Sequence, residues 1–80
     1  MTTLETVQAI YAGILGRTPE EIDVDVDVYG LGGDSVQAVQ IALELEMRFA
    51  VAVPMDVFEA SSDARSAAAW IEAQPGAATG

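Results

Sequence analysis

The stretch that decides the fold is Leu31-Gly32-Gly33-Asp34-Ser35, because an apolar run with helical spacing follows it directly. Its two glycines accept backbone angles that other residues avoid, so the chain can turn sharply there. Asp34 and Ser35 are both residue types that cap helix N-termini. The run that follows has helical periodicity and comprises Val36, Val39, Ile41, Leu43, Leu45, Met47 and Phe49. The sequence therefore predicts a helix from Ser35 to residue 49 or 50, with the Ser35 hydroxyl exposed at its entrance.

Two further helices are predicted, one at each end of the chain. The first spans residues 3–15, where Thr2 and Glu5 fit a capping box and Gly16 provides the C-terminal stop. Its apolar stripe comprises Leu4, Val7, Ile10, Tyr11, Ile14 and Leu15. The last helix is expected to be capped by Ser61 or Ser62 and to run to about Ala73. Its packing face comprises Ala64, Ala67, Ala68, Trp70 and Ile71, with Trp70 in the core or at its edge.

Shorter elements are predicted between these helices. Residues 18–21 read Thr-Pro-Glu-Glu, which indicates about one helical turn within a long connection. Residues 51–54 end the middle helix, because the residue before Pro54 is pushed towards extended angles. A short helix over residues 55–59 should carry Val57 and Phe58 inward.

In residues 22–29 three aspartates alternate with three valines, a period of two that is typical of a strand. A lone strand has no clear partner in this chain, so we predict an extended loop that tucks some valines and Leu31 into the core. The carboxylates also raise a calcium hypothesis, with Asp23, Asp25, Asp27 and Asp34 at loop positions 1, 3, 5 and 12. Val28 stands where such a loop needs glycine, so solvated charge is the preferred interpretation.

Together these elements predict an all-α fold, a small four-helix bundle of three longer helices and one short one. A long loop would join the first two helices. We expect one domain over residues 1–74 and a flexible tail over residues 75–80.

Composition restricts what the domain can do. The net charge is −10, which disfavours nucleic acids and anionic membranes and favours partners with basic patches. The chain lacks histidine, cysteine and lysine, the usual groups for base and nucleophile chemistry near neutral pH, so we expect no enzymatic activity and no metal site. No signal peptide or membrane span is evident, and we expect a cytoplasmic monomer.

The motif at residues 31–35, opening the second of four helices in an acidic chain of 80 residues, resembles the phosphopantetheine-dependent carrier proteins. The resemblance extends from the first helix to Trp70-Ile71. It implies that a phosphopantetheinyl transferase attaches 4′-phosphopantetheine, from coenzyme A, to the hydroxyl of Ser35. Gly33 and Asp34 would belong to the motif that the transferase reads, with Asp34 either capping the helix, lying near the transferase's magnesium, or both.

The resemblance also implies a partner surface for a loading enzyme, adenylating or acyl-transferring, and for downstream synthase or tailoring enzymes. Its expected residues are Val36, Gln37, Gln40, Glu44, Glu46, Met55 and Val57. Whether Val36 faces outward or packs down is left open.

Departures from the family pattern refine the functional prediction. Gln37 and Gln40 stand where fatty-acid-type carriers usually place acids, and the double glycine before Asp34 is more typical of peptidyl carriers. Asp63 and Ser66 replace residues that are often apolar, which predicts looser or rearranged packing there. We therefore predict a carrier of thioester-bound aminoacyl or acyl groups in nonribosomal peptide or polyketide biosynthesis. The alternatives are an acyl carrier of fatty-acid type and, from another class, a small acidic calcium-binding or interaction module. The first helix lies so close to Met1 that we expect a free-standing protein, with an excised module domain as the alternative.

Overall fold

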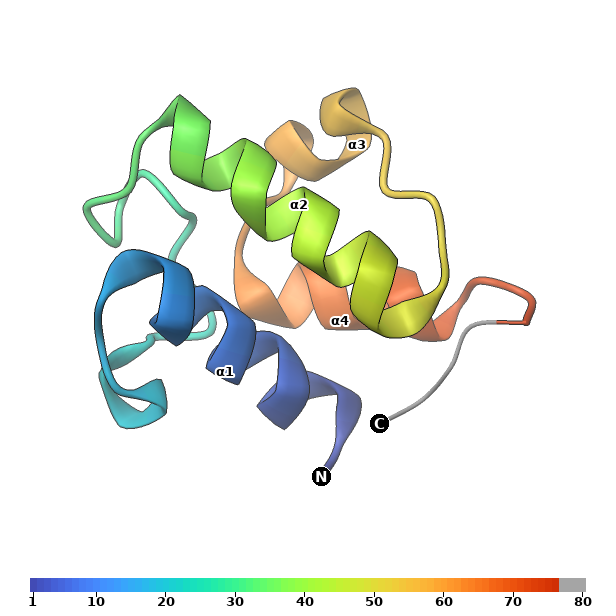
Figure 1. The fold of residues 1–80 in the computed structure, drawn as a ribbon, viewed down its shortest axis with the longest axis horizontal. Helices are drawn as coiled ribbons and strands as arrows, with labels where there is room; N and C mark the ends of the chain where they lie inside the picture. Colours follow the sequence, from blue (N-terminus) through green and yellow to red (C-terminus); the bar gives the residue numbers. More distant parts are fainter. Residues whose placement is uncertain (77–80) are drawn as a thin grey trace.

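The computed structural model describes residues 1–76. Its α-helices are α1 (Thr3–Leu15), α2 (Ser35–Phe49), α3 (Met55–Ala60) and α4 (Ala64–Glu72), and a 3₁₀ turn, η1 (Pro19–Glu21), follows α1. Within these residues no β-strand occurs. Helix α1 packs against both α2 and α4, and α3 contacts α2 (Figure 1). This arrangement confirms the predicted bundle of three longer helices and one short one.

Both ends of α1 form as predicted. The Thr2 hydroxyl accepts a hydrogen bond from the N–H of Glu5 at 3.1 Å, and the Glu5 carboxylate accepts one from the N–H of Thr2 at 2.9 Å. Gly16 ends the helix in the left-handed region, with φ of 71°. The next N–H, that of Arg17, donates to the carbonyl of Ala12 at 2.9 Å, which fixes where Arg17 leaves the helix.

The sequence predicted α2 without assigning its buried face, because apolar residues occur on more than one side of it. Its buried residues are Ala38, Ile41, Ala42, Leu45 and Phe49. Val36, Val39, Leu43 and Met47 are all exposed, with Leu43 at 53% and Met47 at 78%. The periodicity correctly predicted a helix. It did not identify the side that faces the core, because apolar residues lie on both the buried and the exposed sides of α2. We call the four exposed residues Val36, Val39, Leu43 and Met47 the α2 ridge.

Helix α2 ends at Phe49, as predicted, although proline is not what stops it. Ala50 adopts the left-handed conformation with φ of 55°, which ends the helix one residue later. The carboxylate of Glu46 then accepts a hydrogen bond from the N–H of Val53 at 2.7 Å. This bond holds the connection to α3 against the last turn of α2.

Two predictions about α3 and α4 are wrong. Phe58 is buried as expected, but Val57 is 38% exposed, because the short helix packs through one side chain of this pair only. Helix α4 is capped by Asp63, whose carboxylate accepts from the N–H of Ser66 at 3.0 Å, and not by Ser61 or Ser62. The two polar residues that departed from the family pattern, Asp63 and Ser66, thus form the helix start.

Ser62 is buried and links three parts of the chain. Its hydroxyl accepts a hydrogen bond from the N–H of Val28 at 3.2 Å, and its carbonyl accepts one from the Tyr11 hydroxyl at 2.6 Å. Burial is the main reason that the pKa of Tyr11 is raised, so the phenol stays protonated as the donor. The bonds tie α1 and the long loop to the α3–α4 connection.

The C-terminal prediction is tested in part only. The residues predicted as packing face on α4 are buried, except that Trp70 lies half-buried at the edge of the core. Of the predicted tail, Pro75 and Gly76 are exposed, and residues 77–80 lie outside the described residues. Over residues 1–76 no helix is long and apolar enough to cross a membrane.

Candidate functional site at the entrance of α2

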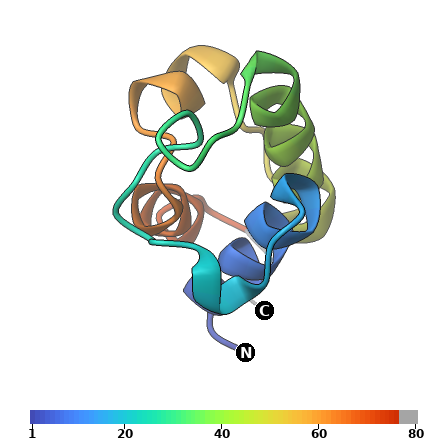
Figure 2. The ribbon, with the colours of Figure 1, turned by 90° about the vertical axis from the view of Figure 1, so that its left-hand side faces the viewer.

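The long loop that leads to α2 closes one end of the bundle, where it passes α4 and α3 (Figure 2). It buries Ile22, Val28 and Leu31, and packs Val24 and Val26 against the core more loosely. Successive turns replace the strand that the alternating pattern would normally indicate. The predicted loop that places some valines and Leu31 in the core is therefore confirmed, but it is built from turns and not from extended backbone.

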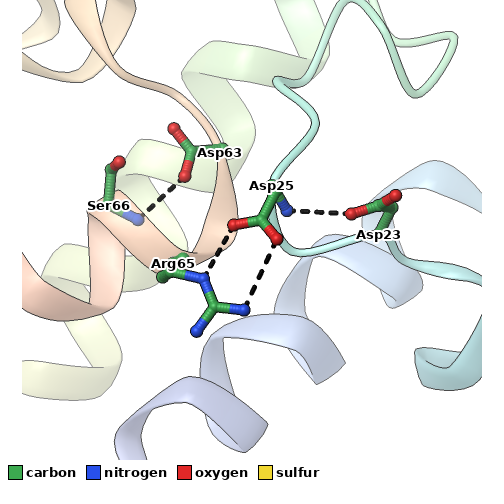
Figure 3. A network of polar contacts seen from close by, with 5 residues as sticks. All are labelled: Asp23, Asp25, Asp63, Arg65 and Ser66. Atoms are coloured by element: carbon green, nitrogen blue, oxygen red, sulfur yellow. Dashed lines mark hydrogen bonds and ion pairs between the residues drawn. The ribbon is translucent and has the colours of Figure 1, made fainter.

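A clasp between the loop and α4 fixes the first half of this loop (Figure 3). The Nε of Arg65 donates to Oδ1 of Asp25 at 2.7 Å, and its Nη2 lies 3.5 Å from Oδ2. The backbone N–H of Arg65 also donates to the carbonyl of Val24 at 3.0 Å. The hydrogen bond from Arg65 is the main reason that the pKa of Asp25 is lowered.

The loop carboxylates that raised the calcium hypothesis are each engaged locally. Asp23 accepts from the N–H of Asp25 at 3.0 Å, and Asp27 accepts from the N–H of Gly30 at 2.7 Å. Asp25 faces Arg65 (Figure 3). Among the described residues, no group of three or more acidic, histidine or cysteine side chains is arranged to hold a metal ion.

A tight turn carries the chain from the loop into α2. The N–H of Gly32 donates to the carbonyl of Tyr29 at 3.0 Å, and that of Gly33 to the carbonyl of Val28 at 2.8 Å. Gly32 has φ of 91°, a conformation that side chains disfavour. At Gly33 a Cβ atom would lie 2.7 Å from Val28 Cγ1, so this glycine is required by space. The two glycines are needed for different reasons.

Asp34 is the N-cap of α2, one of the two roles considered for it. Its carboxylate accepts from the N–H of Gln37 at 2.9 Å, and Oε1 of Gln37 accepts from the N–H of Asp34 at 3.1 Å. This reciprocal pair is a capping box with glutamine in the third position. Gln37, predicted as a partner residue, is half-buried, and its side chain takes part in the capping of α2.

Ser35 is the exposed first residue of α2. No hydrogen bond among residues 1–76 uses its hydroxyl, nor the N–H groups of Ser35 and Val36. Free N–H groups and the helix dipole at this position favour an attached anionic group. Because the chain has no histidine, lysine or cysteine, nothing of the usual kind activates this hydroxyl from within. The geometry suits an acceptor hydroxyl that another protein modifies.

Acidic groups surround Tyr29, in the residues that precede this entrance. The exposed hydroxyl of Tyr29 donates to the Glu59 carboxylate at 3.4 Å, which links the loop to α3. The pKa of Tyr29 is raised by partial desolvation first, and then by the charges of Glu59, Asp27 and Asp34. Tyr29 was not predicted as a site residue, although its position just before the glycine turn was the available signal.

The remaining predicted partner residues divide into exposed and engaged groups. Val36 faces outward with 64% exposure, which settles the question left open above, and Gln40 and Glu44 are exposed beside the α2 ridge. Met55 is half-buried on α3. Glu46 is half-buried and holds the Val53 N–H, so its carboxylate is less free for a partner.

A mostly apolar groove of about 710 Å³ lies between α3 and α4. Its lining includes Leu45, Val57, Phe58 and Trp70, and it does not include Ser35. The groove is therefore separate from the acceptor hydroxyl in the described structure.

Comparisons with known proteins identify this architecture. A family model described as the phosphopantetheine attachment site matches residues 5–71. A carboxylic acid reductase of Segniliparus rugosus is 40% identical over 70 residues, which cover 86% of this chain and 6% of the relative. Nonribosomal peptide synthetase 8 of Aspergillus fumigatus is 37% identical over 56 residues, which cover 70% of this chain and 1% of the relative.

A third relative, 3-methylorcinaldehyde synthase tropA of Talaromyces stipitatus, is 32% identical over 56 residues, which cover 70% of this chain and 2% of the relative. The chain thus spans a small fraction of the length of the relatives it matches. The group that the family carries covalently is 4′-phosphopantetheine, and an exposed, unengaged serine hydroxyl at a helix entrance fits that group. From its match over residues 5–71, this chain belongs to the phosphopantetheine attachment-site family of carrier domains.

Proposed function

We propose that Ser35 carries 4′-phosphopantetheine and that the chain shuttles thioester-bound aminoacyl or acyl groups between enzymes of natural-product biosynthesis. The observation that carries this proposal is the exposed Ser35 hydroxyl, free of hydrogen bonds among the described residues, at the start of α2 and inside the matched segment. The thiol of the attached group would supply the thioester chemistry, since the chain has no cysteine of its own.

The attachment step follows from the chemistry of the site. The Ser35 oxygen attacks the pyrophosphate of coenzyme A, one phosphorus–oxygen bond forms, and the bond to the departing 3′,5′-ADP breaks. The hydroxyl proton must pass to a base on the phosphopantetheinyl transferase, because this chain offers no neutral-pH base. Gly33 and Asp34 would be read by the transferase as part of the same turn. On this proposal the chain is a non-catalytic substrate and scaffold.

The proposed clients are a loading enzyme, adenylating or acyl-transferring, and downstream synthase or tailoring enzymes. Relatives named as a nonribosomal peptide synthetase and as 3-methylorcinaldehyde synthase support a role in natural-product biosynthesis. A fatty-acid client has less support, because Gln37 and Gln40 are neutral and Gln37 is held in the capping box. The domain would occupy residues 1–74.

The test is the intact mass of the protein after incubation with coenzyme A, magnesium and a phosphopantetheinyl transferase of broad specificity. We expect the wild type to gain one phosphopantetheinyl group and Ser35→Ala to gain none. Ser61→Ala is the matched control, because Ser61 is also exposed but lies before α4, and it should be modified like the wild type. A folded wild type that gains no mass would contradict the proposal.

A further inference from the structure

The three cationic side chains of this acidic chain occupy very different places. Arg65 is engaged with Asp25 in the clasp. Arg48 lies in the last turn of α2, thirteen residues after Ser35, which at 1.5 Å per residue is about 20 Å along the helix. Only Arg17 lies beside the turn that presents Ser35.

The end of α1 places Arg17 close to the glycine turn. Its backbone N–H bonds to Ala12, so the residue leaves α1 in a set direction. Its Nη2 atom lies 3.4 Å from where a Cβ would stand on Gly32. This is an ordinary contact distance, so the guanidinium lies against the turn. Gly32 and Ser35 are three residues apart, at most about 11 Å even in a fully extended chain.

Arg17 has no ion-pair partner among residues 1–76, where the single salt bridge joins Arg65 and Asp25. Its charge contributes to lowering the pKa of Glu21 as the smallest cause, after the two hydrogen bonds with Thr18. The Glu21 carboxylate accepts hydrogen bonds from the N–H of Thr18 at 2.8 Å and from the Thr18 hydroxyl at 3.1 Å. The guanidinium keeps its donors for another anion.

A phosphate ester on Ser35 would be that anion. It would stand near Asp34, whose loop also carries Asp27 and Tyr29, and Glu59 of α3 lies against Tyr29. These acids repel a phosphodiester, whereas a cation and the free N–H groups of Ser35 and Val36 attract it. The residues around the turn therefore include several acids and one cation, Arg17.

We propose that the guanidinium of Arg17 binds the phosphodiester that joins 4′-phosphopantetheine to Ser35. The inference rests on the proposed function. The pairing would draw the root of the arm towards η1 and away from Tyr29 and Glu59, and so set the direction in which the arm leaves the domain.

The experiment compares apo and holo protein by NMR, after intact mass has shown whether the arm is attached. The readouts are the Nε–H resonance of Arg17 and the ³¹P resonance of the phosphodiester. In the wild type we expect the Arg17 resonance to shift on conversion to the holo form. In Arg17→Gln the ³¹P line should shift and narrow relative to the wild type, because the phosphate moves more freely.

Arg48→Gln is the matched control, since it removes the same charge at the far end of α2. Arg48→Gln should leave the position and width of the ³¹P resonance as in the wild type. Arg17→Lys keeps the positive charge and should give a ³¹P resonance between those of the wild type and Arg17→Gln. At about 1 M salt, where the Debye length is about 3 Å, the difference between wild type and Arg17→Gln should shrink.

An Arg17 resonance that does not move in mass-verified holo protein would overturn the inference and leave the carrier function intact. The inference also fails if Arg48→Gln alters the ³¹P line as much as Arg17→Gln does. The wild-type shift decides the question even where Arg17→Gln folds poorly. Absence of any mass gain would overturn both the inference and the proposed function.

Discussion

Asp34 has one observed role, capping α2, and one proposed role, recognition by the transferase. It caps α2 by accepting the Gln37 N–H, and it directly precedes the proposed attachment serine. The cap needs an acceptor oxygen but no charge, since asparagine and aspartate cap helices about equally well. Recognition by a magnesium-dependent transferase would need the charge. Asp34→Asn keeps an acceptor oxygen and removes the charge, so it separates the capping role from the proposed recognition role.

We expect Asp34→Asn to keep the urea unfolding midpoint of the wild type and to be modified more slowly by the transferase. Asp34→Ala should lose both properties, with a loss of about 1 kcal/mol in the free energy of unfolding. Urea titration followed by Trp70 fluorescence and a timed mass assay provide the two measurements. Equal modification rates for Asp34→Asn and the wild type would limit Asp34 to the role of a cap.

At the scale of elements, the loop that bears the site is held chiefly by α4 and its connection to α3. Arg65 clasps Asp25 and Val24, and Ser62 receives the N–H of Val28. None of these contacts comes from α2, the helix that displays Ser35. The orientation of the loop thus depends on residues that are remote in sequence.

The clasp predicts a pH-dependent contribution to stability. The pKa of Asp25 is lowered in the fold, mainly by the hydrogen bond from Arg65. The folded state therefore favours the ionised carboxylate. Its contribution is present above the ordinary carboxyl pKa of about 3.8 and is lost as the pH falls through the lower pKa of the folded state.

Thermal unfolding of wild type and Asp25→Asn between pH 7 and pH 2 measures this contribution. We expect a small excess of wild-type stability at pH 7, because both side chains are largely exposed, and none at the acid end. Arg65→Gln should reproduce the loss, and the double variant should add little. A difference that persists unchanged at the lowest pH would exclude the ion pair as its source.

The elements show which features were readable from the sequence. The ends of α1 and the start of α2 depend on neighbours within four residues, so capping and turn rules located them. The start of α4 was misplaced, because three consecutive residues, Ser61 to Asp63, can all cap. Ser62 is instead committed to partners 34 and 51 residues away, which no local rule detects.

In the candidate site, too, some residues could be predicted from the local sequence and others could not. Ser35 and Asp34 were identified from the motif, and the structure places Asp34 as the cap and Ser35 exposed beside it. Arg17 and Tyr29 were missed, because each approaches the site through tertiary structure. The inward face of α2 was not predicted, since apolar residues occur on more than one of its sides and the tertiary structure decides that Ala38 and Ala42 are buried.

At the scale of the whole molecule, the chain has a net charge of −10 and exposes the apolar α2 ridge. The charge opposes association between copies of the chain and attracts basic surfaces from a distance. The ridge offers a non-polar contact once a partner has arrived. Docking should therefore combine electrostatic attraction with a local apolar contact.

We expect binding to a transferase or loading enzyme to weaken as salt is raised, measured by calorimetric titration. Glu44→Gln, next to the ridge, should weaken binding at low salt. Glu72→Gln makes the same charge change at the end of α4 and should have a smaller effect. Salt-insensitive binding would contradict this prediction and would point to an apolar contact centred on Val36, Met55 and Val57.

The link through Ser62 has a consequence for the order of events during synthesis. Ser35 leaves the ribosome well before Ser62, Arg65 and the rest of α4, yet these later residues hold the loop that leads to it. A nascent chain can thus expose the serine without its final geometry, since a domain of this size folds as a unit. Attachment of the prosthetic group would then follow completion of the domain, and incomplete chains would not be modified at Ser35.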